Sequence, residues 1–393
     1  MIILVLCFVV IFSVSSIITA NALRKKVASS TVVYKADETT GNITQEEQIN
    51  NEEPTVKTST TNNVEDVNDN QNINIDSLSE TVDKGMTINL LGEVMMGGVV
   101  SEKLNYSYSS AIKGVYSTTR SADFTYCNFP TNITNLDKIE NVKSKYLVTN
   151  EAITALEALG VDSVSIASDH IIDYPTDIIK NTISKFEEAD IFVAGRENMP
   201  VYFEKDGKKI AIVSTNSVII GTSKNYSNEG ISIYSKDNLS KNIQEAKESA
   251  DVVIADIHWG RDHVYGVTNQ MKDIARAAID AGADMVIGSH ALGVYPIVKY
   301  NDKPIIYSTG YLMSDLDYNV AKEGFIFKVN IDENMKINTL EMTPIFIENK
   351  EAVKLYNEYD LEKCSSYLQQ FNNWHLENGL DSKIEDDKIV INF

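Results

Sequence analysis

Two histidines, each placed just after a short apolar run, are the strongest candidates for chemistry in this 393-residue chain. His258 follows the run Val252–Ile257, and His290 follows Met285–Ile287 after a Gly-Ser pair. Between them lies MKDIARAAIDAG, whose apolar residues have helical spacing and which ends at Gly282. This pattern predicts the strand, helix and strand of a parallel α/β unit, in which ligands bind beyond the carboxyl ends of the strands. We therefore expect the two imidazoles to converge, although a lone histidine there more often only caps its strand.

Three further predicted strand ends carry possible ligands. Glu93 follows the strand in MTINLLGEVMMGG, Asn128 ends the strand in ADFTYCNF, and Asp169 and His170 follow the strand at Ser163–Ala167. Oxygen and imidazole ligands from successive strand ends are what a hydrolytic divalent-metal site requires, although Glu93 alone could also cap a helix. The predicted metal ligands are Glu93, Asn128, Asp169, His170, His258 and His290, and the predicted catalytic groups are His170, His258 and His290.

Other polar residues near these motifs have simpler explanations. Asp173 is expected to hold the loop that carries His170. Arg261 or His263 could contact an anionic substrate or act as an acid, but a solvated turn accounts for both. His375 lies on a predicted helix, where a place in the core or on the surface is the ordinary expectation.

The first 22 residues are uncharged and apolar, which predicts a transmembrane anchor or a signal peptide. The triplet at 20–22, Ala-Asn-Ala, fits a cleavage site, whereas the basic cluster at 24–26 would by itself keep the remainder in the cytoplasm. Residues 23–85 are acidic and nearly free of aromatic side chains, which predicts a disordered linker because little apolar surface can be buried. An acidic tether after an apolar segment favours a domain held at the extracellular face of the cell membrane, or secreted if the signal is cleaved.

Composition sets limits on the remainder. A hydrophobic content of 43% allows a sizeable core, and the net charge of −21 argues against nucleic acid as a partner. The three cysteines are far apart, which favours neither a disulfide framework nor a thiolate metal site. Alternating strand and helix patterns predict one α/β domain at 86–347 and a C-terminal helical extension packed on it at 348–393.

The ordered motifs resemble the CapA family of capsule and poly-γ-glutamate synthesis proteins, whose domain is similar to the calcineurin-like metallophosphatases. The resemblance is carried by GEVMMGG at 92–98, ADFTYCNF at 122–129, LGVDSVSIASDHIIDYP at 159–175, ADVVIADIHWG at 250–260, AGADMVIGSHALGVYPI at 281–297 and KPIIYSTG at 303–310. It implies a layered α/β/β/α sandwich with a divalent metal such as Mn, Zn, Fe or Mg. It also implies a membrane-associated extracellular protein in the synthesis, export or anchoring of an anionic polymer, with that polymer or the capsule synthesis machinery as partner.

Several polar positions depart from the family pattern. Glu93 stands where Asp is usual, Pro130 replaces a Glu, Asp169 replaces an Asn, and Leu292 replaces a His. Fold depends on the apolar strands and glycine turns, which are retained, whereas metal binding depends on ligand number and placement. The metal site is therefore expected to be weakened or lost. Two alternatives stay open, namely an active extracellular metal-dependent hydrolase of a phosphoester or isopeptide, and a non-catalytic binding scaffold.

Overall fold

The computed structural model describes residues 85–135, 146–197, 199–218, 230–261 and 264–393. The predicted anchor or signal at 1–22 lies outside these ranges, as does all of the predicted linker except Gly85, so both stay predictions. Within the described ranges, no helix has the length and hydropathy needed to cross a bilayer.

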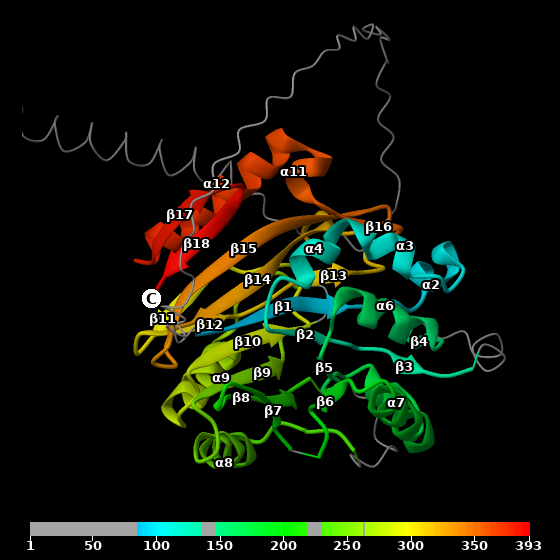
Figure 1. The fold of residues 1–393 in the computed structure, drawn as a ribbon, viewed down its shortest axis with the longest axis horizontal. Coiled ribbons are helices and arrows are strands. Elements are labelled where there is room, and N and C mark those ends of the chain that lie inside the picture. The colour runs from blue at the N-terminus through cyan, green and yellow to red at the C-terminus, as the bar shows by residue number, and fades with distance from the viewer. Residues whose placement is uncertain (1–84, 136–145, 198, 219–229, 262–263) are drawn as a thin grey trace, which may run out of the picture. The chain divides into compact units, whose positions relative to one another are not determined.

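The first sheet contains ten strands of the described chain (Figure 1). Its order is β17 (Asp381–Glu385), β18 (Lys388–Asn392), β15 (Ile337–Glu348), β14 (Glu323–Ile331), β1 (Met86–Val94), β2 (Phe124–Asn128), β5 (Ser163–Ser165) and β6 (Phe192–Ala194), while β13 (Tyr311–Met313) pairs with β1 and β16 (Ala352–Leu355) pairs with β15. Because β1, β2, β5 and β6 run parallel, their carboxyl ends lie at one edge, where Glu93 pairs with Asn128 and Asn128 with Ser165.

The second sheet is built around the two predicted histidine strands. Its order is β11 (Val298–Tyr300), β12 (Lys303–Ile306), β10 (Met285–Ser289), β9 (Val252–His258), β8 (Lys208–Asn216) and β7 (Val201–Lys205). Strands β8, β9, β10 and β12 are parallel, and His258 pairs with Ser289, directly before His290. The parallel α/β unit predicted from the sequence is confirmed. A small separate sheet pairs β3 (Asn132–Ile133) with β4 (Leu147–Val148).

Helices cover the outer face of each sheet, and the inner faces pack against one another (Figure 1). The outer face of the first sheet is packed by α2 (Val99–Leu104), α3 (Ser109–Ile112), α4 (Tyr116–Thr119), α6 (Glu151–Leu159) and α7 (Thr176–Glu188). The outer face of the second is packed by α8 (Lys236–Lys247) and α9 (Asn269–Asp280). A shared core of β1, β2, β14 and β15 against β8, β9 and β10 fills the middle. The predicted α/β/β/α sandwich is confirmed.

Strand alternation decides which side chains of β9 face the first sheet. Val252 and Ile254 belong to the core between the sheets, whereas Val253 belongs to the core under the helices. Side chains two residues apart on a strand lie on the same face. Asp256 and His258 therefore continue the inner face, which changes from apolar to polar as it nears the carboxyl ends of the strands.

A glycine bulge near the end of β1 directs Glu93 to the inner face. The register of β1 shifts between Leu90 and Glu93, and Gly92 between them has a φ of 73°. A Cβ at Gly92 would lie 2.6 Å from the carbonyl oxygen of Gly310. Both the left-handed backbone and the close approach require glycine, because a side chain would be strained and would clash. The extra residue turns the Glu93 carboxylate toward His290.

The C-terminal segment is helical only in part. A helical extension was expected at 348–393, but β16 occupies Ala352–Leu355 before α11 (Tyr356–Tyr359) and α12 (Leu361–Glu377). The final residues form the hairpin β17–β18, and β18 pairs with β15. The segment is therefore part of the first sheet as well as packed upon it. Strands β16 and β18 have only four and five residues and are partly exposed, so their alternation of apolar and polar residues is too short to predict a strand next to a clear helical pattern. One more short helix, α10 (Asn319–Lys322), precedes β14.

Candidate functional site

Three side chains from the carboxyl edges of both sheets form one compact cluster. Asp169 lies on the loop after β5, His258 ends β9, and His290 follows β10. Asp169 Oδ1 is 2.8 Å from His258 Nε2 and 3.8 Å from His290 Nδ1. One ligand atom from each residue lies within 4.8 Å of the others. We call these three residues the Asp–His–His cluster.

Polar groups contact Nδ1 of His258, the ring nitrogen that does not face Asp169. His258 Nδ1 is 3.0 Å from the Ser289 hydroxyl and 3.9 Å from Glu93 Oε1. The imidazole is only 2% exposed, so its orientation is fixed by packing as well as by these contacts. A metal-ligating histidine usually has its second nitrogen engaged in this way, which leaves the first free to face a cation. Here the nitrogen that faces Asp169 is Nε2.

Glu93 supports His290 through the backbone. The N–H of His290 donates a hydrogen bond to Glu93 Oε1, and His290 has a left-handed φ of 71°. Such a backbone is unfavourable for a non-glycine residue and persists only where surrounding contacts impose it. Burial raises the pKa of Glu93, although the neighbouring His258 and the His290 N–H partly oppose the rise. Glu93 thus lies on the Nδ1 side of His258, and the compact cluster does not include it.

One oxygen of Asp169, Oδ2, is buried and accepts no hydrogen bond from the described residues. Burial alone would raise the pKa of Asp169, but the hydrogen bond from His258 and the charges of His258, His170 and His290 outweigh it, so the pKa is lowered. Asp169 is therefore an ionised carboxylate in a nearly dry setting. A buried anionic oxygen without a donor is the kind of group that a cation satisfies.

His170 lies beside the cluster rather than within it. Its Nδ1 is 3.0 Å from Asp173 Oδ2, and its Nε2 is 3.7 Å from Asp169 Oδ2. The ring stacks on Tyr146 with centroids 3.6 Å apart. Burial opposes protonation, but the hydrogen bond with Asp173 and the charges of Asp169 and Glu93 prevail and raise the pKa of His170. Asp173 holds His170 as expected, and its hydrogen bond to Nδ1 favours the protonated imidazole.

Asn128 is turned toward a residue that the sequence did not single out. Its Nδ2 donates to Asp256 Oδ2 at 3.0 Å, and the Tyr126 hydroxyl donates to the same oxygen at 2.6 Å. Burial raises the pKa of Asp256, and the hydrogen bonds from Tyr126, Ser214 and Asn128 partly offset this. A sequence signal for Asp256 existed, since it is a carboxylate inside the apolar run that ends at His258 and shares its face.

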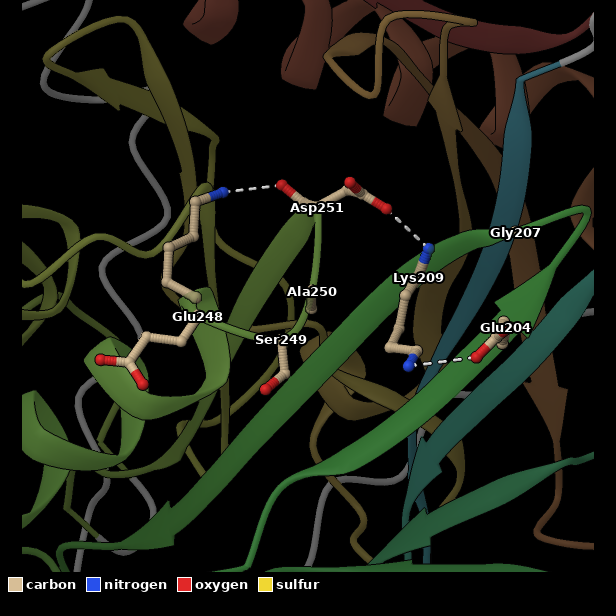
Figure 2. A pocket seen from close by; sticks show the side chains of 8 residues that line it. Glu204, Gly207, Lys209, Glu248, Ser249, Ala250 and Asp251 are labelled. Atoms are coloured by element: carbon tan, nitrogen blue, oxygen red, sulfur yellow. Dashed lines mark hydrogen bonds and ion pairs between the residues drawn. The ribbon is translucent and has the colours of Figure 1, made fainter.

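The remaining candidates fall outside the cluster. Arg261 is exposed, and His263 lies outside the described residues. His375 is fully buried on α12, where its ring centroid is 6.2 Å from that of Phe371. A pocket lined by Lys209, Asp251 and their neighbours lies at the opposite ends of β8 and β9 (Figure 2), and there Lys209 pairs with both Glu204 and Asp251. Neither this pocket nor His375 belongs to the candidate site.

The donor set of the Asp–His–His cluster is compatible with a divalent metal. One carboxylate offsets part of the charge of a cation, and two neutral imidazoles are ligands that zinc, iron and manganese accept. Three protein ligands leave further coordination positions open, which is typical of sites that bind a substrate or water rather than of closed structural sites. Three other residues were also predicted as ligands. Glu93 faces Nδ1 of His258, Asn128 faces Asp256, and His170 faces Asp173. Their roles as ligands or catalytic groups stay predictions, as do those of the cluster.

Comparison with known proteins gives a family match over most of the folded part. A family model described as "Bacterial capsule synthesis protein PGA_cap" matches residues 87–316. "Capsule biosynthesis protein CapA" of Bacillus anthracis is 25% identical over 322 residues, which cover 78% of this chain and 77% of the relative. "PGA biosynthesis protein CapA" of Bacillus subtilis (strain 168) is 25% identical over 323 residues, which cover 78% of this chain and 82% of the relative.

Solved structures give weaker likenesses. A putative 5'-nucleotidase from Staphylococcus aureus has a TM-score of 0.43 at 12% identity, covering 72% of this chain and 58% of that one. A 5'-nucleotidase from Candida albicans SC5314 has a TM-score of 0.38 at 11% identity, covering 77% of this chain and 60% of that one.

Proposed function

The chain belongs to the family of bacterial capsule synthesis proteins called PGA_cap, and from this we propose that it acts in the synthesis, export or anchoring of a capsule polymer such as poly-γ-glutamate. The family match over residues 87–316 carries the proposal. The names of the two Bacillus relatives, which refer to capsule and PGA biosynthesis, support it. The resemblance of the sequence motifs to the CapA family is therefore confirmed.

We place the protein at the extracellular face of the cell membrane. The support is the apolar stretch at 1–22 followed by the acidic, aromatic-poor segment at 23–85. The partner is then the anionic polymer itself or the machinery that makes it. Protease added to intact cells should remove the folded domain, while a cytoplasmic control protein survives. A domain that is protected until the cells are lysed would contradict this placement.

We propose that Asp169, His258 and His290 together bind one divalent cation. The buried oxygen of Asp169 without a donor and the distances within the Asp–His–His cluster support this. A bound cation of this kind would polarise a carbonyl or phosphoryl oxygen. The chain itself holds the imidazole of His258 through Ser289 and the backbone of His290 through Glu93. His170 lies beside them, its pKa is raised, and in its protonated form it would attract an anionic group of the polymer.

Deletion of the gene in its own bacterium tests the function. Cell-bound polyglutamate should fall in the deletion strain, and the wild-type gene should restore it. Released polyglutamate should fall as well if the protein acts in synthesis or export, and should rise if it acts in anchoring. Complementation with His258→Ala then separates the roles of the cluster, because a scaffold would restore the polymer fully and a cation-dependent protein would not. Unchanged polymer in the deletion strain would refute the proposed function.

An active hydrolase is the second candidate, and the Asp–His–His cluster is the observation that favours it. Purified protein supplied with manganese or zinc should then cleave a phosphodiester or a γ-glutamyl isopeptide, and His258→Ala should abolish turnover. The loss of polar family residues at Pro130 and Leu292 favours instead a non-catalytic scaffold. Cation binding without turnover of either substrate class would support the scaffold.

A further inference from the structure

A group of five polar side chains lies between the two sheets near the Asp–His–His cluster. We call it the inter-sheet cluster, and it consists of Tyr126, Asn128, Ser165, Ser214 and Asp256. Asp256 is at its centre and is 1% exposed. Asp256 Oδ2 accepts hydrogen bonds from Tyr126 at 2.6 Å, from Asn128 at 3.0 Å and from Ser214 at 2.8 Å. Tyr126 and Asn128 belong to the first sheet, whereas Ser214 and Asp256 belong to the second.

A third hydrogen bond joins the two sheets at the same place. The hydroxyls of Ser165 and Ser214 are 2.6 Å apart. Because Ser214 uses its proton on Asp256, Ser165 must be the donor in this pair. The first sheet therefore donates to the second through three side chains. Further from the site, the same gap is filled by aliphatic residues such as Ile212 and Ile254.

Fold stability alone does not account for a carboxylate at this position. The groups that donate to Asp256 Oδ2 are neutral, and Asp256 Oδ1 has no hydrogen-bond partner among the described residues. Apolar side chains of similar volume usually stabilise an interior at least as well as a buried charge. What a directional polar network adds is one defined arrangement of the groups it joins.

The arrangement in question is the distance between the sheets at their carboxyl edges. Asp169 is carried by the first sheet, and His258 and His290 are carried by the second. The 2.8 Å contact between Asp169 and His258 thus depends on how far apart the sheets lie. Asp256 is two residues before His258 on the same face of β9. Ligand positions must hold to within about half an ångström for a cation site to work.

We propose that Asp256 is a positioning residue that sets the spacing of the two sheets under the Asp–His–His cluster and fixes the amide of Asn128. With Asn128 Nδ2 donating to Asp256, the amide oxygen points away from Asp256. The proposal rests on the proposed cation site for its effect on binding, but the spacing itself can be measured without any cation. It assigns Asp256 no contact with substrate or cation.

The test uses the full chain, purified in mild detergent, with cobalt(II) as the probe. Asp256→Ala removes the common acceptor, and its cobalt affinity should fall by about 10- to 100-fold with an altered visible absorption spectrum. Asp256→Asn keeps one oxygen for the three donors, so its affinity should stay within about threefold of wild type. Val252→Ala, on the same face of β9 at its other end, is the control for a general loss of core packing. The proposal would be overturned if Asp256→Ala bound cobalt with the same affinity as Val252→Ala. It would also be overturned if Asp256→Asn lost as much cobalt affinity as Asp256→Ala.

A second readout does not depend on the cation. The chain has five histidines, so a spectrum of histidine-selectively labelled protein has few signals. The imidazole signals of His258 and His290 should shift in Asp256→Ala and stay in place in Asp256→Asn and Val252→Ala. If wild-type protein binds no cobalt, the proposed cation site fails, and these shifts alone decide whether Asp256 sets the spacing.

Should Asp256→Ala fail to fold, the donors can be removed instead. The double variant Tyr126→Phe/Ser214→Ala keeps Asp256 and leaves only the Asn128 donor of the original three. It should move the same two imidazole signals and weaken cobalt binding in the same direction. Unmoved signals in this variant would refute the role of the network.

Discussion

The buried imidazole of His375 predicts a steep loss of stability in mild acid. The side chain is fully buried on α12, and neither ring nitrogen has a hydrogen-bond partner within the described part of the chain. Burial therefore lowers the pKa of His375 from 6.5 to about 4. The unfolded chain binds a proton more readily than the folded protein between these two values. The free energy of unfolding must then fall as the pH drops from 6.5 toward 4.

The size of this effect follows from the two pKa values. Each pH unit between them is worth about 1.4 kcal/mol. The difference between 6.5 and about 4 therefore removes roughly 3 kcal/mol of stability. This is a large share of the roughly 5–15 kcal/mol that holds an ordinary domain folded. Above pH 6.5 the contribution of His375 should no longer vary with pH.

Urea unfolding at a series of pH values, with and without His375→Leu, measures the effect. A fragment that begins at residue 81, where the compact unit starts, is suitable. Carboxylates and the other histidines titrate in both proteins, so the difference between the two curves isolates His375. Leucine should leave stability equal or higher at pH 7.5, and its advantage should grow by roughly 3 kcal/mol at pH 4. A difference that stays constant to within about 0.5 kcal/mol from pH 7.5 to 4 would refute the reasoning.

Three more outcomes are expected. Gly92→Ala should lower the free energy of unfolding, measured in urea, by about 2–4 kcal/mol through backbone strain and the clash with Gly310. Gly207 has a similar φ but open space around it, so Gly207→Ala should lower the free energy of unfolding by only about 1–2 kcal/mol. Equal losses in the two variants would exclude the clash. Zinc or manganese should raise the melting temperature and EDTA should reverse this, and a shift that persists in His290→Ala would contradict the proposed ligand set. Asp169→Asn should weaken zinc binding at least about tenfold in a competition titration with a chromophoric chelator, and an unchanged dissociation constant would remove Asp169 from the site.

Much of the fold could be predicted because it depends on local patterns. The runs Val252–Ile257 and Met285–Ile287 mark the two central strands of the second sheet, and the helix between them ends near Gly282. Polar residues placed at the ends of parallel strands must lie at one edge of a sheet, so the approach of His258 to His290 was predictable too. Their ring centroids are 4.8 Å apart.

Side-chain direction at that edge could not be predicted, because it is set by partners far away in the sequence. Asn128 turns to Asp256, which is 128 residues later in the chain. Glu93 faces the backbone of His290 because of a bulge whose effect on side-chain direction depends on the strands beside it. A strand-end position can therefore be inferred from one sequence, whereas the difference between a ligand and a supporting residue depends on tertiary contacts.

The place of β18 in the sequence, after β15, has a consequence for biosynthesis. β18 pairs with β15, and the N–H of Phe393 donates to the carbonyl of Asn338. Because β15 is synthesised before β18, the first sheet is complete only once residues 388–392 have left the ribosome. Until then the edge of β15 stays open, and an open edge is a template for pairing with other chains. Chains truncated before β18 should therefore aggregate or be degraded, even though every residue of the candidate site has been made.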